Sequence, residues 1–323
     1  MDLNKSDYLE LYRQMVLTRL YDSKANEWYL SGKIKECVHE STGEEAITIG
    51  CCYGLRKTDQ VMPALRSRGA FIGKGVPVRT ALLAMAAKRT SLSMGHETSH
   101  HAVYPELGVL PGTGMVGSSI SIGTGAALAI QMQGRDDVVF NFFGDGAANR
   151  GDFHEAINLA GAWKLPCIYV IENNQVSLST EQKEVTATKK FSDRALGYGI
   201  PGYTIDGNNV LEVYEYAQRA VERARKGEGP TLLDCVTFRM RPHIGYNVDN
   251  RDKELLDYWR EKCPIKHLYN YLIENNIATS EELDKIEVDM DKHMEDEFTS
   301  IQDEPAATFE DMLNHVTEEG GVL

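Results

Sequence analysis

The chain lacks the features that would place it in a membrane, in a secretory pathway or on nucleic acid. It has no apolar run of about 18 residues, so no membrane span is predicted. The first ten residues, MDLNKSDYLE, show neither the basic nor the apolar region of a signal peptide. Acidic residues outnumber basic ones by 48 to 34, and the resulting net charge of −14 argues against nucleic acid and anionic membranes as partners.

Cysteine pairs of the Cys-x-x-Cys type are also missing, although six cysteines are present. Several of the six lie in apolar runs, as buried and reduced thiols do, so we expect a cytoplasmic protein. Hydrophobic residues make up 42% and charged residues 25% of the chain, which is typical of a globular protein. No internal repeat or low-complexity linker interrupts the sequence, so we expect a single domain over residues 1–323.

The segment 142–175 predicts a strand, a turn, a helix and a second strand. Residues 137–143 (DVVFNFF) and 167–171 (CIYVI) are apolar and rich in β-branched or aromatic side chains, as strands buried on both faces are. Between them, Asp152 and Glu155 resemble a capping box, and apolar residues follow at helical spacing. In a right-handed βαβ unit the ends of both strands reach the same edge of a parallel sheet.

Polar side chains stand where each of these two strands ends. Asp145 lies between Gly144 and Gly146, which permit close approach of the backbone, and Asn174 follows the second strand. A carboxylate and an amide oxygen at this edge suit a hard cation that carries phosphate oxygens. A capped turn followed by an asparagine-rich loop is the alternative, but each motif supports the structural context of the other.

The sequence of residues 142–175, FFGDGAANRGDFHEAINLAGAWKLP…ENNQ, resembles that of the α subunit of the heteromeric 2-oxo acid dehydrogenases. These are the thiamine-diphosphate-dependent first components of the pyruvate, branched-chain and acetoin dehydrogenase complexes. Gly-Asp-Gly followed at this interval by Asn-Asn is the thiamine-diphosphate fingerprint, and the similarity runs from about Tyr8 to about Arg251. The resemblance implies an α/β fold with a mostly parallel sheet and helices on both faces. We expect a helical arm over residues 1–40 and a helical extension over residues 252–323.

The resemblance also implies thiamine diphosphate and Mg²⁺ as cofactors and assigns residues to them. The metal ligands would be Asp145, Asn174 and the backbone carbonyl of Val176, where family members often have tyrosine. The positions that match cofactor-binding residues of the family are Arg66, Gly114, Val116, Gly144, Asp145, Gly146, Ala147, Asn174 and His243. Of these, backbone groups of Gly114 and Val116 would hold the aminopyrimidine ring, and His243 would also be the active-site histidine.

One predicted loop departs from the family pattern. Residues 65–69 read Leu-Arg-Ser-Arg-Gly, whereas the family reads Tyr-Arg-x-His-Gly. A tyrosine hydroxyl is lost, and a pocket histidine has become Arg68, a permanent cation that we interpret as a group for a substrate carboxylate. In residues 94–101 (MGHETSHH), we favour a substrate-pocket role for His100 or His101 over the alternative of a zinc site.

Two other functions are suggested by parts of the sequence. A dinucleotide-dependent oxidoreductase would use Gly-x-G-x-x-Gly at residues 112–117, but no strand is predicted before that string and no acidic residue closes a following strand. A split transketolase would typically have glutamate where Ala147 stands. Neither alternative accounts for the fingerprint as well as a 2-oxo acid dehydrogenase does.

The resemblance finally implies partners. The catalytic glutamate and the pyrimidine-binding domain belong, in the family, to a β subunit, and we expect no room for a second such domain in 323 residues. We therefore expect an α2β2 heterotetramer that decarboxylates a pyruvate-like 2-oxo acid or cleaves acetoin and passes the acyl group to a lipoyl acyltransferase. Mammalian relatives are inactivated by phosphorylation of a serine after the histidine that matches His243. Here Ile244 follows, and residues 239–252 contain no serine or threonine, so we expect no such control.

Overall fold

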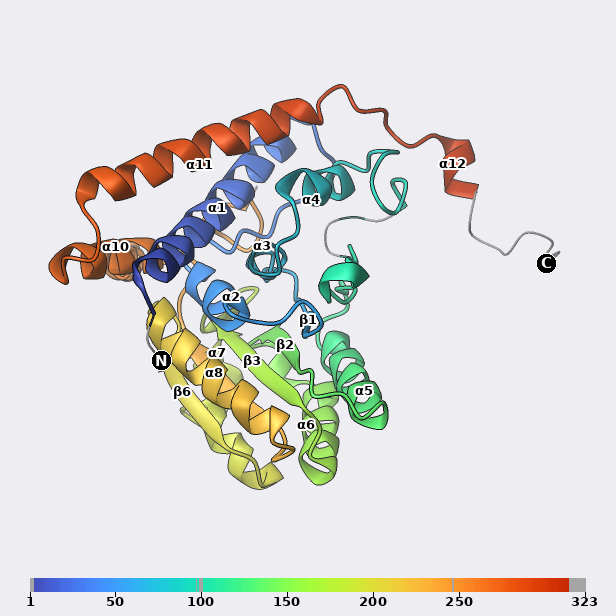
Figure 1. Ribbon diagram of the computed structural model, residues 1–323, viewed down its shortest axis with the longest axis vertical. Helices are drawn as coiled ribbons and strands as arrows, with labels where there is room; N and C mark the ends of the chain where they lie inside the picture. Colours follow the sequence, from blue (N-terminus) through green and yellow to red (C-terminus); the bar gives the residue numbers. More distant parts are fainter. Residues whose placement is uncertain (1–2, 97, 99–100, 246, 314–323) are drawn as a thin grey trace.

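A five-stranded parallel sheet forms the centre of the computed structural model, which describes residues 3–96, 98, 101–245 and 247–313 (Figure 1). The strand order is β1-β2-β3-β7-β6. The strands are β1 (Gln60–Met62), β2 (Val139–Gly144), β3 (Cys167–Asn173), β6 (Gly202–Asp206) and β7 (Thr231–Val236). A short antiparallel hairpin of β4 (Val176–Ser177) and β5 (Thr180–Glu181) follows β3.

The pairing of β2 with β3 decides where the functional residues lie. Both strands are almost wholly buried, as their apolar sequences predict. Their parallel register places Gly144 opposite Glu172 at the carboxyl end. Asp145 and Asn174, which follow these two positions closely, therefore reach the same edge of the sheet, and the predicted βαβ unit is confirmed.

Helices cover both faces of the sheet, and the predicted fold class is confirmed. One face packs against α5 (Ser118–Met132), α6 (Gly151–Trp163) and a 3₁₀ helix over Phe191–Tyr198. The other face packs against α2 (Glu45–Cys52) and α8 (Val210–Arg225). The remaining helices are α3 (Gly69–Gly73), α4 (Val78–Met85), α7 (Gln182–Val185), α9 (Lys253–Glu261) and α12 (Phe309–Leu313), together with α1, α10 and α11 below. No helix within the described ranges has the continuous apolar length that a membrane crossing requires.

The N-terminal helix differs from the arm that was expected over residues 1–40. Helix α1 (Lys5–Leu30) packs into the body of the molecule beside α10 (Pro264–Glu274) and α11 (Ser280–Ser300), as Figure 1 shows. Its residues Leu11 and Tyr12 are fully buried in the cluster that these helices share. After residue 252, the part of the chain that the structure describes contains helices α9, α10, α11 and α12.

The predicted capping box at the start of α6 is wrong. Helix α6 begins at Gly151 without a side-chain cap, because the Asp152 carboxylate accepts a hydrogen bond from Arg150 Nε instead (3.1 Å). Helix α2 also begins without a side-chain cap, because the Ser41 hydroxyl donates to buried Asp22 (2.6 Å). In both cases a long-range or charged partner replaces the local bond that the sequence suggests.

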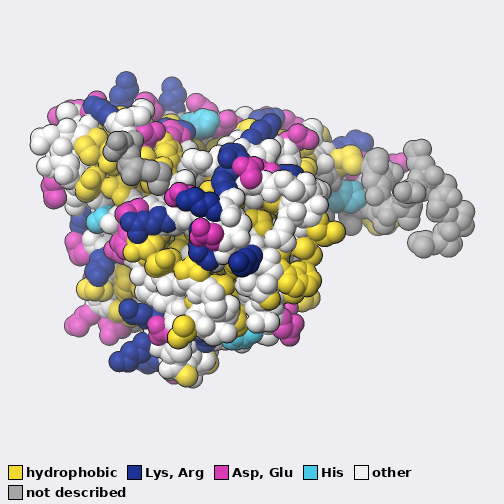
Figure 2. Space-filling model, turned by 60° about the horizontal axis from the view of Figure 1, so that its bottom comes forward, with side chains coloured by type: hydrophobic (Ala, Val, Ile, Leu, Met, Phe, Trp, Pro, Cys, Tyr) yellow, Lys and Arg dark blue, Asp and Glu magenta, His cyan; other side chains and the backbone are white. Residues whose placement is uncertain are grey.

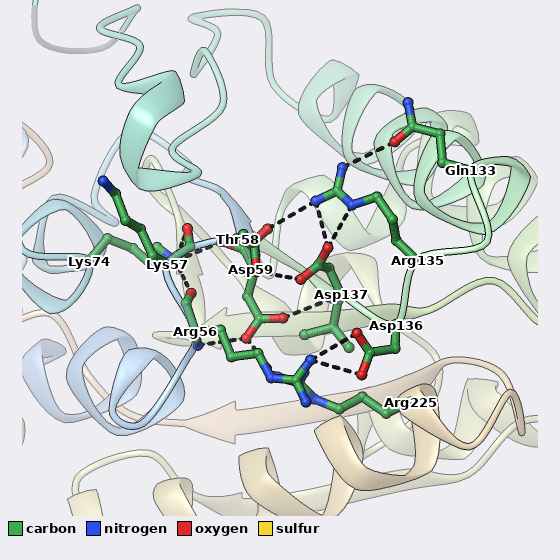
Figure 3. Close-up of polar contacts among 11 residues, drawn as sticks. Arg56, Lys57, Thr58, Asp59, Lys74, Gln133, Arg135, Asp136, Asp137 and Arg225 are labelled. Atoms are coloured by element: carbon green, nitrogen blue, oxygen red, sulfur yellow. Dashed lines mark hydrogen bonds and ion pairs between the residues drawn. The ribbon is translucent and has the colours of Figure 1, made fainter.

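At the amino edge of the sheet, opposite the functional residues, a network of charges ties several segments together (Figure 3). The fully buried Asp59 carboxylate accepts from Arg225 Nη2 (2.7 Å) and from the backbone amides of Arg56 and Val138. Lys74 Nζ donates to the carbonyl oxygens of Arg56, Lys57 and Asp59 at 2.8, 3.4 and 2.6 Å. This network joins α3 and α8 to the starts of β1 and β2.

Candidate functional site

A cleft opens at the carboxyl ends of β2 and β3. It brings together segments that are far apart in the sequence, because each contributes a loop to this edge of the sheet. The cleft is lined by Glu44, residues 64–66, Thr113, residues 115–117, Ser119, residues 143–147, Glu172, Asn174, residues 176–178 and His243. The structure thus brings Arg66, Val116, Gly144, Asp145, Gly146, Ala147, Asn174, Val176 and His243 into one place, as the sequence predicts.

Asp145 occupies the turn that follows β2. Its carboxyl group is almost fully buried, and burial raises its pKa to about 6, with partial compensation from the Gly146 amide and the nearby Arg239 charge. A Cβ atom at Gly146 would lie 2.1 Å from Ser177 Oγ, so only glycine permits the close packing of this turn on β4. The second glycine of the motif therefore fixes the position of Asp145 in the cleft.

The two asparagines after β3 have different roles. Asn173 Nδ2 donates to Asp234 Oδ1 (2.8 Å), which ties β3 to β7. Asn174 lies in the cleft wall, where its Nδ2 donates to Glu44 Oε1 (3.1 Å) and its Oδ1 accepts from the Val176 amide (3.3 Å). A carbonyl oxygen has two lone pairs, so Asn174 Oδ1 retains one for a ligand.

Arg66 and His243 form a pair on the wall of the cleft. Arg66 Nη2 donates to the His243 backbone oxygen (2.7 Å) and lies 3.0 Å from His243 Nδ1, while Nη1 donates to the Glu40 carbonyl (2.8 Å). Because a guanidinium can only donate, Nδ1 is the acceptor and the proton of the neutral ring sits on Nε2. Burial, assisted by the charges of Arg66 and Arg239, lowers the His243 pKa to about 4, so the ring is neutral near pH 7.

Two buried glutamates in the cleft wall were not predicted as site residues. Glu172 accepts from Ser67 Oγ (2.8 Å), and burial raises its pKa to about 7. Burial also raises the pKa of Glu44 to about 8, and its Oε2 atom has no hydrogen-bond partner among the described residues. In the sequence, Glu44 resembles a helix cap and Glu172 the end of a strand. Their positions become visible only when α2 and β3 are packed together.

Arg239, which follows β7, is a third residue that sequence reasoning missed. It is buried, and its Nη2 donates to the Leu178 carbonyl (3.0 Å). Burial and the neighbouring charges of Arg66 and Arg251 lower its pKa to about 10. Arg251 Nη1 donates to the Arg239 carbonyl (2.5 Å), which holds Arg251 against this strand end. Arg239 lines a second cavity, which shares Val176, Leu178 and His243 with the cleft.

The structure places Arg68 and His101 outside the lining of the cleft. Arg68 is buried in an ion pair, with Nε 2.8 Å from Asp22 Oδ1, and its Nη2 donates to the His39 carbonyl (2.7 Å). It is therefore a structural cation here and not the substrate-carboxylate group that we inferred. His101 is exposed, and its Nδ1 lies 3.1 Å from the carbonyl of Gly112, next to Gly114 at the rim. His100 lies outside the described residues.

Comparisons with known proteins agree on one family. The model of the dehydrogenase E1 component family matches residues 12–310. The pyruvate dehydrogenase E1 component subunit alpha of Rhizobium meliloti is 35% identical over 306 residues, which cover 94% of this chain and 88% of that protein. The subunit alpha of the acetoin:2,6-dichlorophenolindophenol oxidoreductase of Bacillus subtilis is 32% identical over 327 residues, which cover 100% of this chain and 98% of that protein. The somatic mitochondrial form of the pyruvate dehydrogenase E1 component subunit alpha of Bos taurus is 33% identical over 317 residues, which cover 97% of this chain and 80% of that protein.

Proposed function

Because this chain belongs to the dehydrogenase E1 component family, as an α subunit of the thiamine-diphosphate-dependent 2-oxo acid dehydrogenases, we propose that its cleft anchors Mg²⁺ and the diphosphate of the cofactor. The observation that carries this proposal is the convergence of Asp145 and Asn174 on one cleft from the ends of two neighbouring strands. The dinucleotide and transketolase alternatives are not favoured by the relatives.

The residues of the cleft fit both groups. The Asp145 carboxylate, the Asn174 amide oxygen and the Val176 carbonyl are the hard oxygen donors that Mg²⁺ prefers. Arg66 and Arg239 supply positive charge for phosphate oxygens. Glu44 Oε2 is a buried polar atom in the wall with no partner among the described residues, and a water kept by Mg²⁺ would give it a hydrogen-bond partner.

When bound, thiamine diphosphate supplies the nucleophile and the electron sink for cleaving a bond next to a carbonyl group. The residues of this chain hold and orient it. Arg66 fixes the neutral His243 with its Nε2 proton available as a donor. The apolar side chains of Leu65, Met115 and Phe143 form part of the wall and exclude water from the charged groups. Excluding water strengthens each electrostatic contact inside the cleft.

As an α subunit, the chain acts together with a β subunit. We propose that this partner supplies the catalytic glutamate and the pyrimidine-binding domain in an α2β2 assembly, and that a lipoyl acyltransferase accepts the acyl group. Exposed apolar side chains at the cleft and on the adjoining turn of α5, Met115, Val116 and Ile122, support a partner surface here. Figure 2 shows apolar patches among charged side chains on one face of the molecule. Free cysteines, four of them buried, support the proposed cytoplasmic location.

The test is to bind the cofactor to the α–β assembly and to an Asp145→Ala variant. Calorimetry should show Mg²⁺-dependent binding of thiamine diphosphate to the wild type and none to the variant, because the remaining neutral ligands cannot balance the charge of the metal. Thermal shift with nicotinamide nucleotides serves as the comparison, and we expect no stabilisation. Unchanged cofactor affinity in the variant would refute the role of Asp145. Full 2-oxo acid decarboxylation by the α subunit alone would refute the shared active site.

A further inference from the structure

We propose that Glu44 is a positioning residue for the cation: it fixes the Asn174 amide in the orientation that presents Oδ1 to the metal. The inference rests on the proposed function, since it concerns the same cleft. No sequence motif pointed to Glu44. It stands at the start of α2 and lies 130 residues before Asn174 in the sequence.

The contact itself defines the orientation of the amide. Glu44 Oε1 accepts from Asn174 Nδ2 at 3.1 Å, and both side chains are buried. Asn174 Oδ1 accepts from the Val176 amide on the other side. A rotation of the amide by 180° would lose the bond to Val176, because Nδ2 would then face the Val176 amide, another donor. The two contacts therefore select the one orientation in which the oxygen faces the Val176 side of the cleft.

A purely structural role does not explain the second carboxyl oxygen. Glu44 is the N-cap residue of α2, yet its side chain makes no capping hydrogen bond. It forms no ion pair with any described residue, whereas its equally buried neighbour Glu45 pairs with Arg19 (Nε–Oε1 2.7 Å). Its Oε2 atom is buried in the cleft wall and has no partner in the described part of the chain. Such an atom lowers stability, so a site that retains it has another use for the carboxyl group.

The variants Glu44→Met and Glu44→Gln separate the possible roles. Methionine has a similar length and no strong acceptor, so it removes one of the two hydrogen bonds that hold the Asn174 amide. Glutamine keeps a carbonyl oxygen that can accept from Asn174 Nδ2. Mg²⁺ is titrated into the α–β assembly at saturating thiamine diphosphate. We expect Glu44→Met to lower the affinity for Mg²⁺ by about 10- to 100-fold, as loss of a residue that supports a metal ligand does. Glu44→Gln should restore most of this loss. The matched control is Glu45→Gln, which alters a buried carboxyl group on the same helix outside the cleft.

A second measurement distinguishes a positioning role from a structural one. Melting of the cofactor-free assembly should show Glu44→Gln close to the wild type in stability, because glutamine keeps the acceptor for Asn174 and places an equally unpartnered amide nitrogen where Oε2 lies. Equal Mg²⁺ affinity in the wild type and Glu44→Met would overturn the inference, and so would a loss of affinity in Glu45→Gln as large as that in Glu44→Met. A wild-type assembly that binds thiamine diphosphate without any cation would instead overturn the proposed metal site, and this inference with it.

Discussion

At the scale of single residues, Arg66 and Arg68 lie two positions apart, are both buried, and have different roles. Arg66 contacts His243 in the cleft, whereas Arg68 neutralises Asp22 behind it. The sequence suggests a substrate contact for Arg68 because it replaces a pocket histidine of the family. That interpretation missed the partner, since Asp22 lies on α1 and looks like an ordinary polar residue of a helix.

Arg68→Met should therefore destabilise the fold without changing cofactor binding. Removing one partner of a buried ion pair leaves the other charge uncompensated, which costs about 3–5 kcal/mol. Urea unfolding measures this loss, and calorimetry with thiamine diphosphate should give the wild-type affinity. The double variant Asp22→Asn with Arg68→Met is the control, and it should recover part of the lost stability. A stable Arg68→Met protein that binds substrate poorly would restore the substrate role.

His243 predicts a specific pH dependence. Its pKa in the folded protein is about 4, below the value of about 6.5 for an unperturbed histidine, so the unfolded chain binds this proton more readily. The contribution of His243 to stability is thus present above about pH 6.5 and is lost as the pH falls towards 4. His243→Asn keeps an acceptor for Arg66 and lacks this titration. Melting temperatures from pH 7 to pH 4 should fall more steeply for the wild type, and parallel curves would contradict the assignment.

Prediction of the site from sequence succeeded where a motif ends a strand. Asp145 and Asn174 were placed correctly because parallel strands end at one edge, whatever the loops do. Glu44 and Arg239 were missed because their contacts depend on how α2 and the end of β7 pack against β3. No local pattern in the sequence records such a contact.

At the scale of elements, replacing two helical glycines by alanine should change stability in opposite directions. Gly50 in α2 faces α8, where a Cβ atom would lie 2.8 Å from Val213 Cγ1 and 2.9 Å from the Val210 carbonyl. Gly50→Ala should therefore destabilise the chain by about 1–3 kcal/mol, since α8 must move. Gly125 in α5 has no atom within 4 Å of the same position, so Gly125→Ala should stabilise it by about 0.5–1 kcal/mol. Chemical unfolding of the chain without its partner measures both, and the same sign for the two variants would contradict the packing.

The elements themselves were more predictable than their ends. The strands expected over residues 137–143 and 167–171 are present as β2 and β3, within a few residues of those ranges, because apolar residues extend over their whole length. At the start of α6, the residue that was expected to cap the helix, Asp152, binds Arg150 instead. An end depends on one or two bonds, which tertiary contacts can replace.

At the scale of the whole molecule, the segment after β7 connects the cleft to the C-terminal helices. Arg251 pairs with Asp249 (2.8 Å), donates to the Arg239 carbonyl and lies 5.2 Å from the Phe238 ring centre. Phe238 in turn stacks on Trp259 of α9, with ring centres 5.4 Å apart. Arg251 thus holds the C-terminal end of this segment against residues 238 and 239, which follow β7.

We expect this segment to become more ordered when the cofactor binds. Limited proteolysis near Asn247 should be slower with Mg²⁺ and thiamine diphosphate, because His243 lines the cleft and gains a ligand there. Arg251→Met should keep cleavage fast in both conditions, since it releases the anchor at the Arg239 carbonyl. The control is Arg260→Met, which removes an exposed pair with Asp257 on α9. Equal protection of the wild type and Arg251→Met would show that the anchor is not needed.

The network at the amino edge of the sheet has a consequence for how the protein responds to its ionic surroundings. The ammonium group of Lys74 occupies a cage of three backbone carbonyl oxygens, an arrangement that could otherwise hold a potassium or sodium ion. A cation that is covalently part of the chain cannot dissociate, so this corner never loses its ion when the ionic composition of the cell changes.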